Sequence, residues 1–190
     1  MKRRVVLAGI GLPWLGLPAI AESDPAAEAM TALRRGSVVV LLRHAATEPG
    51  IGDPPGFRLG ECATQRQLSE PGREQARRIG TWFGARGLAP AEVRSSAWCR
   101  CLDTASLAFG RARAWPPLNS FFGERSAESA QSAALRKALG RLPAQNFEVW
   151  VTHQVNISAL TGVSPGMGEA LVVRMSGGKV HNLARIRFED

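Results

Sequence analysis

The sequence of 190 residues contains no tyrosine, and phenylalanine and tryptophan together make up only 6% of it. Proteins that bind single-stranded nucleic acid stack bases on aromatic side chains, so this scarcity argues against such a role. The sequence also has no internal repeat and no low-complexity tract. With 45% hydrophobic and 21% charged residues, its composition is that of an ordinary globular domain with a core.

Cysteine and histidine are also scarce, with three residues of each. The cysteines are Cys62, Cys99 and Cys101, and in an oxidising compartment they allow one disulfide and leave one thiol. A Cys-x-Cys pair is a weak metal signal, and no neighbouring histidine or cysteine completes a zinc site. We therefore interpret the cysteines as structural and expect no metal site.

Acidic residues are outnumbered, because 24 Lys and Arg residues stand against 16 Asp and Glu, for a formal charge of +8. Three of the basic residues lie within the first 21 positions, so the remaining chain carries +5. This mild excess does not argue for a nucleic-acid partner. Only two lysines, Lys137 and Lys179, lie beyond residue 21. The excess is therefore almost all arginine, which favours bidentate recognition of carboxylate or phosphate.

The first 21 residues have the pattern of a signal peptide. Basic residues at 2–4 precede an apolar stretch at 5–17, and Ala19-Ile20-Ala21 supplies a small-x-small cleavage site. The apolar stretch is too short, and too interrupted by Gly and Pro, to span roughly 30 Å of hydrocarbon. We expect a periplasmic or secreted protein with a mature domain of residues 22–190 and no stable membrane insertion. An uncleaved N-terminal anchor is the alternative.

Strand and helix patterns alternate along the rest of the chain, which predicts one three-layer α/β/α domain around a mostly parallel sheet. Apolar, β-branched runs predict strands at 37–42, 92–96, 147–151, 171–175 and 180–188. Helical spacing predicts helices at 24–35, from Ser69 to beyond Phe83, and at 98–109, 127–142 and 155–160.

Polar side chains stand where the predicted parallel strands end. The first strand runs into Arg43 and His44, the second leads to Arg100, and the third ends just before His153. Open α/β sheets bind ligands beyond the carboxyl ends of their strands, so these four side chains are expected at one edge of the sheet. A Gly- and Pro-rich loop of about twenty residues follows His44, long enough to suggest a functional role.

Two arginines and two histidines suit a phosphate group. Arginine forks bind phosphate oxygens through charge-assisted hydrogen bonds, and a neutral imidazole can attack phosphorus to form a phosphohistidine. The positive field of the arginines disfavours a protonated imidazole, which keeps His44 nucleophilic. The leaving oxygen then needs a proton from a carboxylic acid or from the second imidazole.

Four ordered motifs between residues 38 and 162 resemble those of the histidine phosphatase superfamily, which has the phosphoglycerate mutase-like fold. Leu-Leu-Arg-His-Ala at 41–45 resembles its Arg-His-Gly motif, and 66–76 resembles its "R-x-L-[ST]-x-x-G-x-x-Q-A" helix entry. The segment 95–105 resembles "S-x-x-x-R-x-x-x-T-A", and Val-Thr-His at 151–153 resembles the strand that carries the second histidine. The short chain resembles the small, cap-less branch, which includes phosphohistidine phosphatases and lipopolysaccharide-core heptose phosphatases.

The resemblance implies a role for each of the four side chains. It makes His44 the nucleophile that becomes phosphorylated, Arg43 and Arg100 the phosphate-binding arginines, and His153 the second histidine that contacts the transferring group. It also implies that the reaction needs no metal ion and no organic cofactor. Ala45 stands where the family usually has glycine.

The proton donor is where this sequence departs from the family. Mutase-like members carry a Leu-x-Glu element, but residues 118–120 here read Leu-Asn-Ser. We predict that Glu124, the nearest downstream carboxylate, donates the proton, with Glu48 and Asp53 as further candidates. If none of them serves, the enzyme would depend on good leaving groups or on His153.

The resemblance also bears on the cysteines. It brings the loop after His44 close to the helix that begins around Cys99, which predicts a disulfide between Cys62 and either Cys99 or Cys101. A bridge between Cys99 and Cys101 would be geometrically strained and is less favoured.

These observations predict an exported phosphomonoesterase that hydrolyses a phosphorylated small molecule or an envelope sugar phosphate. Substrate choice should depend on the loop 47–63 and the segment 114–127. The alternative is a non-catalytic envelope protein that binds a phosphorylated ligand on the same fold. The sequence leaves the oligomeric state open.

Overall fold

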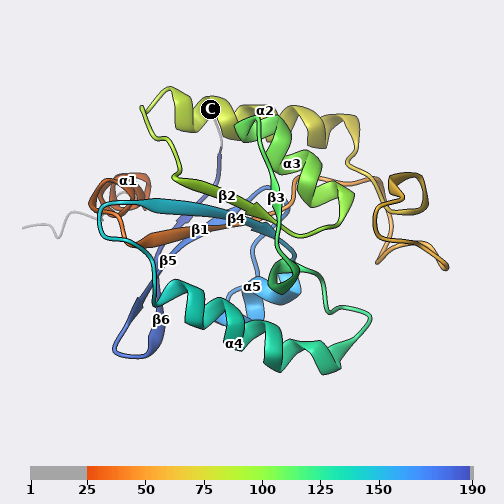
Figure 1. Cartoon of the computed structure of the whole chain (residues 1–190). Helices are drawn as coiled ribbons and strands as arrows, with labels where there is room; N and C mark the ends of the chain where they lie inside the picture. Colours follow the sequence, from red (N-terminus) through yellow and green to blue (C-terminus); the bar gives the residue numbers. More distant parts are fainter. Residues whose placement is uncertain (1–24, 189–190) are drawn as a thin grey trace, which may run out of the picture.

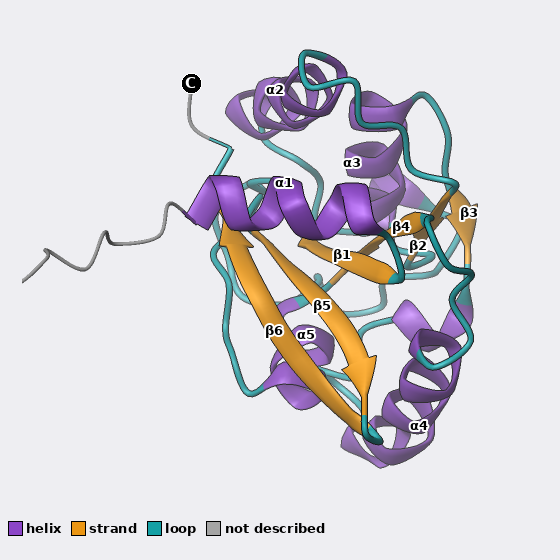
Figure 2. Cartoon of the chain, turned by 90° about the vertical axis from the view of Figure 1, so that its left-hand side faces the viewer, coloured by secondary structure: helices purple, strands orange, loops and turns teal. Residues whose placement is uncertain are grey.

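A computed structural model describes residues 25–188 of the chain. The predicted signal peptide, residues 1–21, lies outside the described residues, so its cleavage stays a prediction. A six-stranded sheet forms the centre of the molecule, and helices cover both of its faces (Figures 1 and 2). Within residues 25–188, no helix combines the length and apolarity needed to cross a membrane.

The sheet is mostly parallel, as predicted, with an antiparallel hairpin at one edge. The strands follow the order β3-β2-β4-β1-β5-β6. Parallel pairs join β1 to β4, β4 to β2 and β2 to β3, whereas β5 runs antiparallel to β1 and β6 antiparallel to β5. The strands are β1 (Val38–Arg43), β2 (Glu92–Ser95), β3 (Arg113–Ala114), β4 (Phe147–Thr152), β5 (Ala170–Ser176) and β6 (Lys179–Ile186).

Strand β1 explains why a continuous apolar run belongs at the centre of this fold. Its first five residues are all buried, and they alternate between the two faces of the sheet. Val40 and Leu42 pack into the core on one face, and Val39 and Leu41 pack into the core on the other. A strand covered on both faces has no position for a polar side chain until its end, at Arg43.

Five helices form the two outer layers (Figure 1). The core on one face holds residues of α1, α2 and α3, and the core on the other holds residues of α4 and α5. Ser69 caps α2 as expected, because its hydroxyl accepts a hydrogen bond from the backbone N–H of Gly72 at 3.2 Å. The helices are α1 (Pro25–Arg35), α2 (Glu70–Gly84), α3 (Cys99–Phe109), α4 (Glu128–Leu139) and α5 (Gln154–Thr161), and short 3₁₀ turns lie at Cys62–Thr64, Pro116–Leu118 and Arg125–Ala127.

Helix α4 and strand β3 differ most from the prediction, and strand β6 ends at Ile186 instead of 188. Helix α4 ends at Leu139 instead of extending to 142, because Gly140 is a poor helix former and Pro143 disfavours helical geometry at the residue before it. Strand β3 was not predicted at all. Its two residues are exposed and pair only with β2, so they leave no apolar pattern in the sequence.

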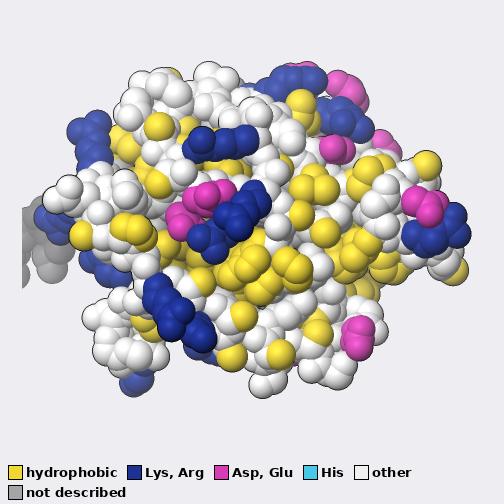
Figure 3. Space-filling model, viewed as in Figure 1, with side chains coloured by type: hydrophobic (Ala, Val, Ile, Leu, Met, Phe, Trp, Pro, Cys, Tyr) yellow, Lys and Arg dark blue, Asp and Glu magenta, His cyan; other side chains and the backbone are white. Residues whose placement is uncertain are grey.

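Charged side chains are distributed over the face seen in Figure 3 without forming one field. Lys and Arg side chains lie in separate groups there, among acidic and apolar side chains.

Candidate active site

The two histidines reach the same edge of the sheet because β1 and β4 are parallel neighbours in register. Arg43, the last residue of β1, lies opposite Thr152, the last residue of β4. His44 and His153 therefore follow at equivalent positions, and their ring centroids lie 5.5 Å apart. Both side chains are buried, as is that of Arg100 in the first turn of α3. The structure thus brings the four side chains singled out in the sequence to one place.

The His44 ring is fixed in one tautomer. Its Nδ1 lies 2.9 Å from the backbone carbonyl oxygen of Ala45. A carbonyl oxygen can only accept a hydrogen bond, so Nδ1 carries the proton and Nε2 keeps its lone pair. Burial, reinforced by the charges of Arg100 and Arg43, lowers the pKa of His44 to about 3 and outweighs the opposing hydrogen bond to Ala45. His44 is therefore a neutral imidazole whose Nε2 is the nucleophilic atom.

Three arginines surround this ring, one more than the sequence analysis identified. The charges of Arg43, Arg66 and Arg100 all lower the pKa of His44, although burial contributes most. Each of the three has a buried guanidinium Nε without a hydrogen-bond partner in the described structure. Buried donors without an acceptor are costly, and an oxyanion bound among them would satisfy them. Arg66 opens the Arg-x-Leu-Ser motif, so the signal for its role was present in the sequence.

His153 is held by partners on both ring nitrogens. Arg100 Nη2 lies 3.4 Å from Nδ1 and can only donate, so Nδ1 accepts and Nε2 carries the proton. Nε2 in turn donates to the hydroxyl of Ser96 at 2.8 Å. Burial, followed by the charges of His44 and Arg100, keeps the pKa of His153 well below its ordinary value. His153 is therefore a neutral ring of fixed orientation.

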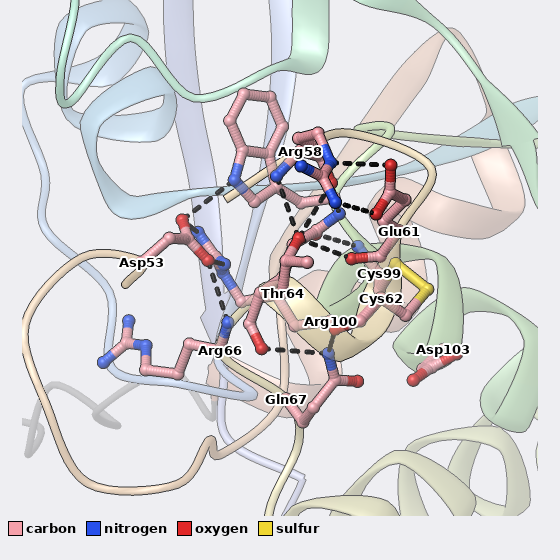
Figure 4. The surroundings of a disulfide bond; sticks show 12 residues. Asp53, Arg58, Glu61, Cys62, Thr64, Arg66, Gln67, Cys99, Arg100 and Asp103 are labelled. Carbon is pink, nitrogen blue, oxygen red and sulfur yellow. Dashed lines mark hydrogen bonds and ion pairs between the residues drawn. A yellow bond between two sulfur atoms is a disulfide. The ribbon is translucent and has the colours of Figure 1, made fainter. Parts of the chain in front are cut away.

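Arg100 forms a buried, bidentate ion pair with Asp53 (Figure 4). Its Nη1 donates to Asp53 Oδ1 at 2.7 Å and its Nη2 donates to Oδ2 at 3.2 Å. The Trp98 indole N–H and the Arg66 backbone N–H also donate to this carboxylate, at 2.9 and 3.0 Å. Burial alone would raise the pKa of Asp53, but the hydrogen bonds and charge of Arg100 prevail and hold it below its ordinary value. Asp53 is thus an ionised carboxylate held on the guanidinium group of Arg100.

Comparison with known proteins finds the fold among solved structures. No protein-family model and no curated protein sequence matches the chain. The protein histidine phosphatase SixA, solved in complex with tungstate, matches with a TM-score of 0.56 and 15% identity, over 80% of this chain and 97% of that one. The chain has the histidine phosphatase fold.

Two further solved structures share it. An Escherichia coli protein assigned as an alpha-ribazole-5′-P phosphatase matches with a TM-score of 0.59 and 18% identity, over 80% of this chain and 97% of the other. A mutant phosphoserine phosphatase of Entamoeba histolytica, in complex with phosphoserine, matches with a TM-score of 0.52 and 13% identity, over 80% and 98%. At these identities the likeness establishes the fold, including its phosphoglycerate mutase-like sheet, and the chemistry is argued from this chain's own residues.

Asn119 lies in the Leu-Asn-Ser segment at 118–120, in which Ser120 stands where the Leu-x-Glu motif has glutamate. Its side-chain Oδ1 accepts a hydrogen bond from the backbone N–H of Ala97 at 2.9 Å and lies 3.4 Å from the Ser96 hydroxyl. Asn119 therefore supports the serine that holds His153. The missing acid is visible in the sequence, but this network is not, because it joins residues far apart in the chain.

The three candidate proton donors occupy different surroundings. Glu124 is exposed on the turn before α4, and its carboxylate accepts a hydrogen bond from the Ser126 hydroxyl. Glu48 is exposed on the loop after His44. Of the three, Asp53 is the one whose carboxylate contacts an arginine of the cluster. The donor role of Glu124 stays a prediction, and the structure adds a direct contact between the Asp53 carboxylate and Arg100.

The disulfide joins Cys62 to Cys99, one of the two predicted pairings, and Cys101 is free and buried. Cys101 points to the other side of α3, where its Sγ lies 3.5 Å from His153 Nε2. Burial raises the pKa of the Cys101 thiol to about 12, so it stays protonated. The disulfide attaches the loop that carries Asp53 to the residue next to Arg100 (Figure 4).

The two segments expected to choose the substrate meet beside the cluster. A Cβ atom on Gly52 would lie 3.8 Å from the ring of Phe122, which places the two segments in contact. Both present exposed apolar side chains, namely Ile51, Phe57 and Leu59 on the first and Phe122 on the second. Their role in substrate choice stays a prediction. In the described part of the chain, no group of three or more His, Cys, Asp or Glu residues is placed to hold a metal ion.

Proposed function

We propose that the protein is a phosphomonoesterase that acts through a phosphohistidine intermediate on His44. The observation that carries this proposal is a buried, neutral imidazole with a free Nε2 that is surrounded by three arginines. A neutral nucleophile beside fixed positive charge suits a substrate that is itself anionic and an electrophile that is phosphorus.

The proposed reaction has two displacements. Arg43, Arg66 and Arg100 bind the phosphate oxygens and neutralise their charge. His44 Nε2 attacks phosphorus, an N–P bond forms, and the bond to the leaving oxygen breaks. Water then attacks the phosphohistidine, and the electron pair of the N–P bond returns to Nε2. The neutral, immobilised ring of His153 keeps Arg100 oriented throughout, through the contact at 3.4 Å.

The proposed substrate is a phosphorylated small molecule or an envelope sugar phosphate, met after export. One fold relative was solved with tungstate and another with phosphoserine, which supports an oxyanion as the ligand of this protein too. The Cys62–Cys99 disulfide supports an oxidising compartment, where such bonds persist. Intact-mass measurement of the protein from the envelope fraction tests export. Cleavage after Ala21 should leave Glu22 first, and retention of Met1 would contradict it.

Hydrolysis of a panel of phosphomonoesters by the parent and by His44→Ala tests the activity. The parent should release phosphate, and His44→Ala should lose turnover because no neighbouring group can attack phosphorus in its place. His181→Ala, which removes an exposed histidine of β6, is the matched control and should keep parent activity. Phosphate binding without turnover by the parent would favour the non-catalytic ligand-binding alternative.

Trapping the intermediate tests the mechanism itself. A phosphoramidate on imidazole is labile in acid and stable in base, so alkaline quenching with labelled substrate should leave the label on the peptide that contains His44. His44→Ala should carry no label. Turnover by His44→Ala at near-parent rates would replace this mechanism with direct attack by water.

A further inference from the structure

Asp53 is bound to the guanidinium group of Arg100, which the proposed substrate needs for its phosphate. Its two carboxylate oxygens take both Nη groups of Arg100, and both side chains are almost fully buried, with 7% and 5% exposed. A carboxylate that accepts a guanidinium fork mimics two oxygens of a phosphate. Phosphate can therefore bind to that fork only if Asp53 gives it up, and the displaced carboxyl then lies beside the phosphate.

We infer that Asp53 is the proton donor of the phosphatase reaction, paired with Arg100 in the resting protein and released from it when phosphate binds. This inference rests on the proposed function. Asp53 lies on the loop after β1 and in no helix or strand, so its side chain can turn away from Arg100 without disturbing the sheet. The Trp98 indole N–H, 2.9 Å from Oδ2, holds the carboxyl at the site while it does so.

The exchange changes the protonation of Asp53 in the required direction. In the resting protein Arg100 favours the ionised carboxylate. After the exchange, Asp53 has lost this cation and faces a phosphate dianion, and both changes favour the protonated acid. The proton has a source, because a phosphomonoester has a second pKa of about 6 and its monoanion can pass a proton to the carboxylate.

Protons and electrons then balance over one cycle. As the His44 Nε2–P bond forms, the bond from phosphorus to the leaving oxygen breaks, and that oxygen takes the proton of Asp53 to become an alcohol. In the second step the Asp53 carboxylate accepts a proton from the attacking water, and the N–P electron pair returns to Nε2. Phosphate leaves after recovering that proton, and Asp53 returns to Arg100.

The neighbouring candidates are engaged elsewhere. The Nε2–H of His153 donates to Ser96 and its Nδ1 accepts from Arg100, so its ring has no proton free for the leaving oxygen. The carboxylate of Glu169 accepts from Arg185 and Arg187, on the side of β6.

The leaving group decides between a proton donor and a residue that merely positions Arg100. Alcohol release is measured in a single turnover with an alkyl phosphate, whose alkoxide needs a proton, and with 4-nitrophenyl phosphate, whose phenolate does not. Asp53→Asn should slow release from the alkyl phosphate by about 10²–10⁴-fold. Release from 4-nitrophenyl phosphate should fall by less than about tenfold, since general-acid help is then of little use. Equal losses with both substrates would overturn the inference.

Three further measurements complete the test: a control variant, a variant that keeps the carboxyl group, and phosphate binding. Asp103→Asn, which removes a half-exposed carboxylate of α3 near Arg73, is the matched control and should not separate the two substrates. Asp53→Glu keeps a carboxyl group and should recover part of the alkyl phosphate rate. Asp53→Asn should bind inorganic phosphate at least as tightly as the parent, because the competitor for Arg100 is gone, and weaker binding would contradict the exchange.

The outcomes separate this inference from the proposed function. A parent that hydrolyses no phosphomonoester would refute the function. A His44-dependent parent in which Glu124→Gln, and not Asp53→Asn, shows the leaving-group pattern would leave the function standing and refute the role of Asp53.

Discussion

At the scale of single residues, reactivity at this site depends on which ring nitrogen holds a proton. His44 and His153 are both buried and neutral, yet their hydrogen bonds differ. His153 has a partner on each nitrogen, whereas His44 has a partner on Nδ1 that leaves Nε2 for chemistry. The proposed roles follow from this difference, with His44 as the nucleophile at one strand end and His153 as a positioning group at the next.

The depressed pKa of His44 makes folding stability depend on pH. Its pKa is about 3 in the folded chain and about 6.5, the ordinary value, in the unfolded chain. Between these values the unfolded chain binds a proton that the folded chain does not, so the free energy of unfolding falls as the pH drops below 6.5. The contribution of His44 to the free energy of unfolding is fully present above pH 6.5.

Replacement of His44 by glutamine should therefore make the free energy of unfolding depend less on pH. Relative to His44→Gln, the parent is expected to lose about 2 kcal/mol between pH 7 and pH 5. Urea unfolding of both proteins across this range measures the difference. Parallel profiles would mean that His44 titrates alike in the folded and unfolded chains.

Arg66 is predicted to bind phosphate although the four-residue pattern did not include it. A charge-assisted hydrogen bond contributes roughly 1.5–3 kcal/mol, so Arg66→Ala should weaken competitive inhibition by inorganic phosphate roughly ten- to a hundredfold. Arg58→Ala removes an exposed arginine of the same loop, paired with Glu61, and should leave inhibition unchanged. Equal effects of the two variants would show that Arg66 acts only through general charge.

At the scale of elements, strand ends and one loop build the site. The parallel register of β1 and β4 sets the spacing of the two histidines, and the first turn of α3 supplies Arg100. The loop between β1 and α2 supplies Asp53 and Arg66, and it has little regular structure of its own. Its attachment to α3 through Cys62–Cys99 therefore controls where these two side chains lie.

The disulfide should stabilise the fold through this attachment. It closes a loop with a sequence separation of 37 residues, which the chain-entropy model converts to roughly 3–4 kcal/mol. The double variant Cys62→Ala/Cys99→Ala should lose about this much unfolding free energy, and the parent in reducing agent should behave alike. Non-reducing peptide mapping checks the pairing, and three free thiols in the mature protein would refute it.

The sequence predicted elements better than contacts. Strand β1 and helix α2 were predicted correctly from the buried apolar run of the first and the apolar stripe of the second. Burial of one face or both faces of an element leaves such a hydrophobic pattern in the sequence. The two residues of β3 are exposed, so they leave no such pattern. Asp53 and Asn119 acquire their partners only when distant segments meet, so no local pattern distinguishes them from solvated loop residues. By contrast, the meeting of His44 and Arg100 could be predicted, because both follow parallel strands whose ends lie at one edge of the sheet.

At the scale of the whole molecule, two layers of helices enclose a sheet whose one edge collects positive charge. Arg43, Arg66 and Arg100 lie at that edge, and the Asp53 carboxylate pairs with Arg100 in the resting protein. The cluster therefore keeps a net positive charge around a neutral nucleophile. An anionic substrate is attracted to such a site and neutralised within it.

This charge arrangement predicts activity that is independent of divalent metal ions. In metal-dependent phosphoryl transfer the ion neutralises charge on the phosphate oxygens and on the leaving group. Here three guanidinium groups are placed to do the first, and Asp53, once protonated after the inferred exchange with phosphate, does the second. Turnover of an alkyl phosphate should therefore persist unchanged in excess EDTA, and added Mg²⁺ or Zn²⁺ should not raise it. Arg100→Ala, by contrast, should lose about 10²–10³-fold in rate, with or without the chelator. Loss of parent activity on chelation, restored by a divalent ion, would show that the arginines do not suffice and that the proposed mechanism is wrong.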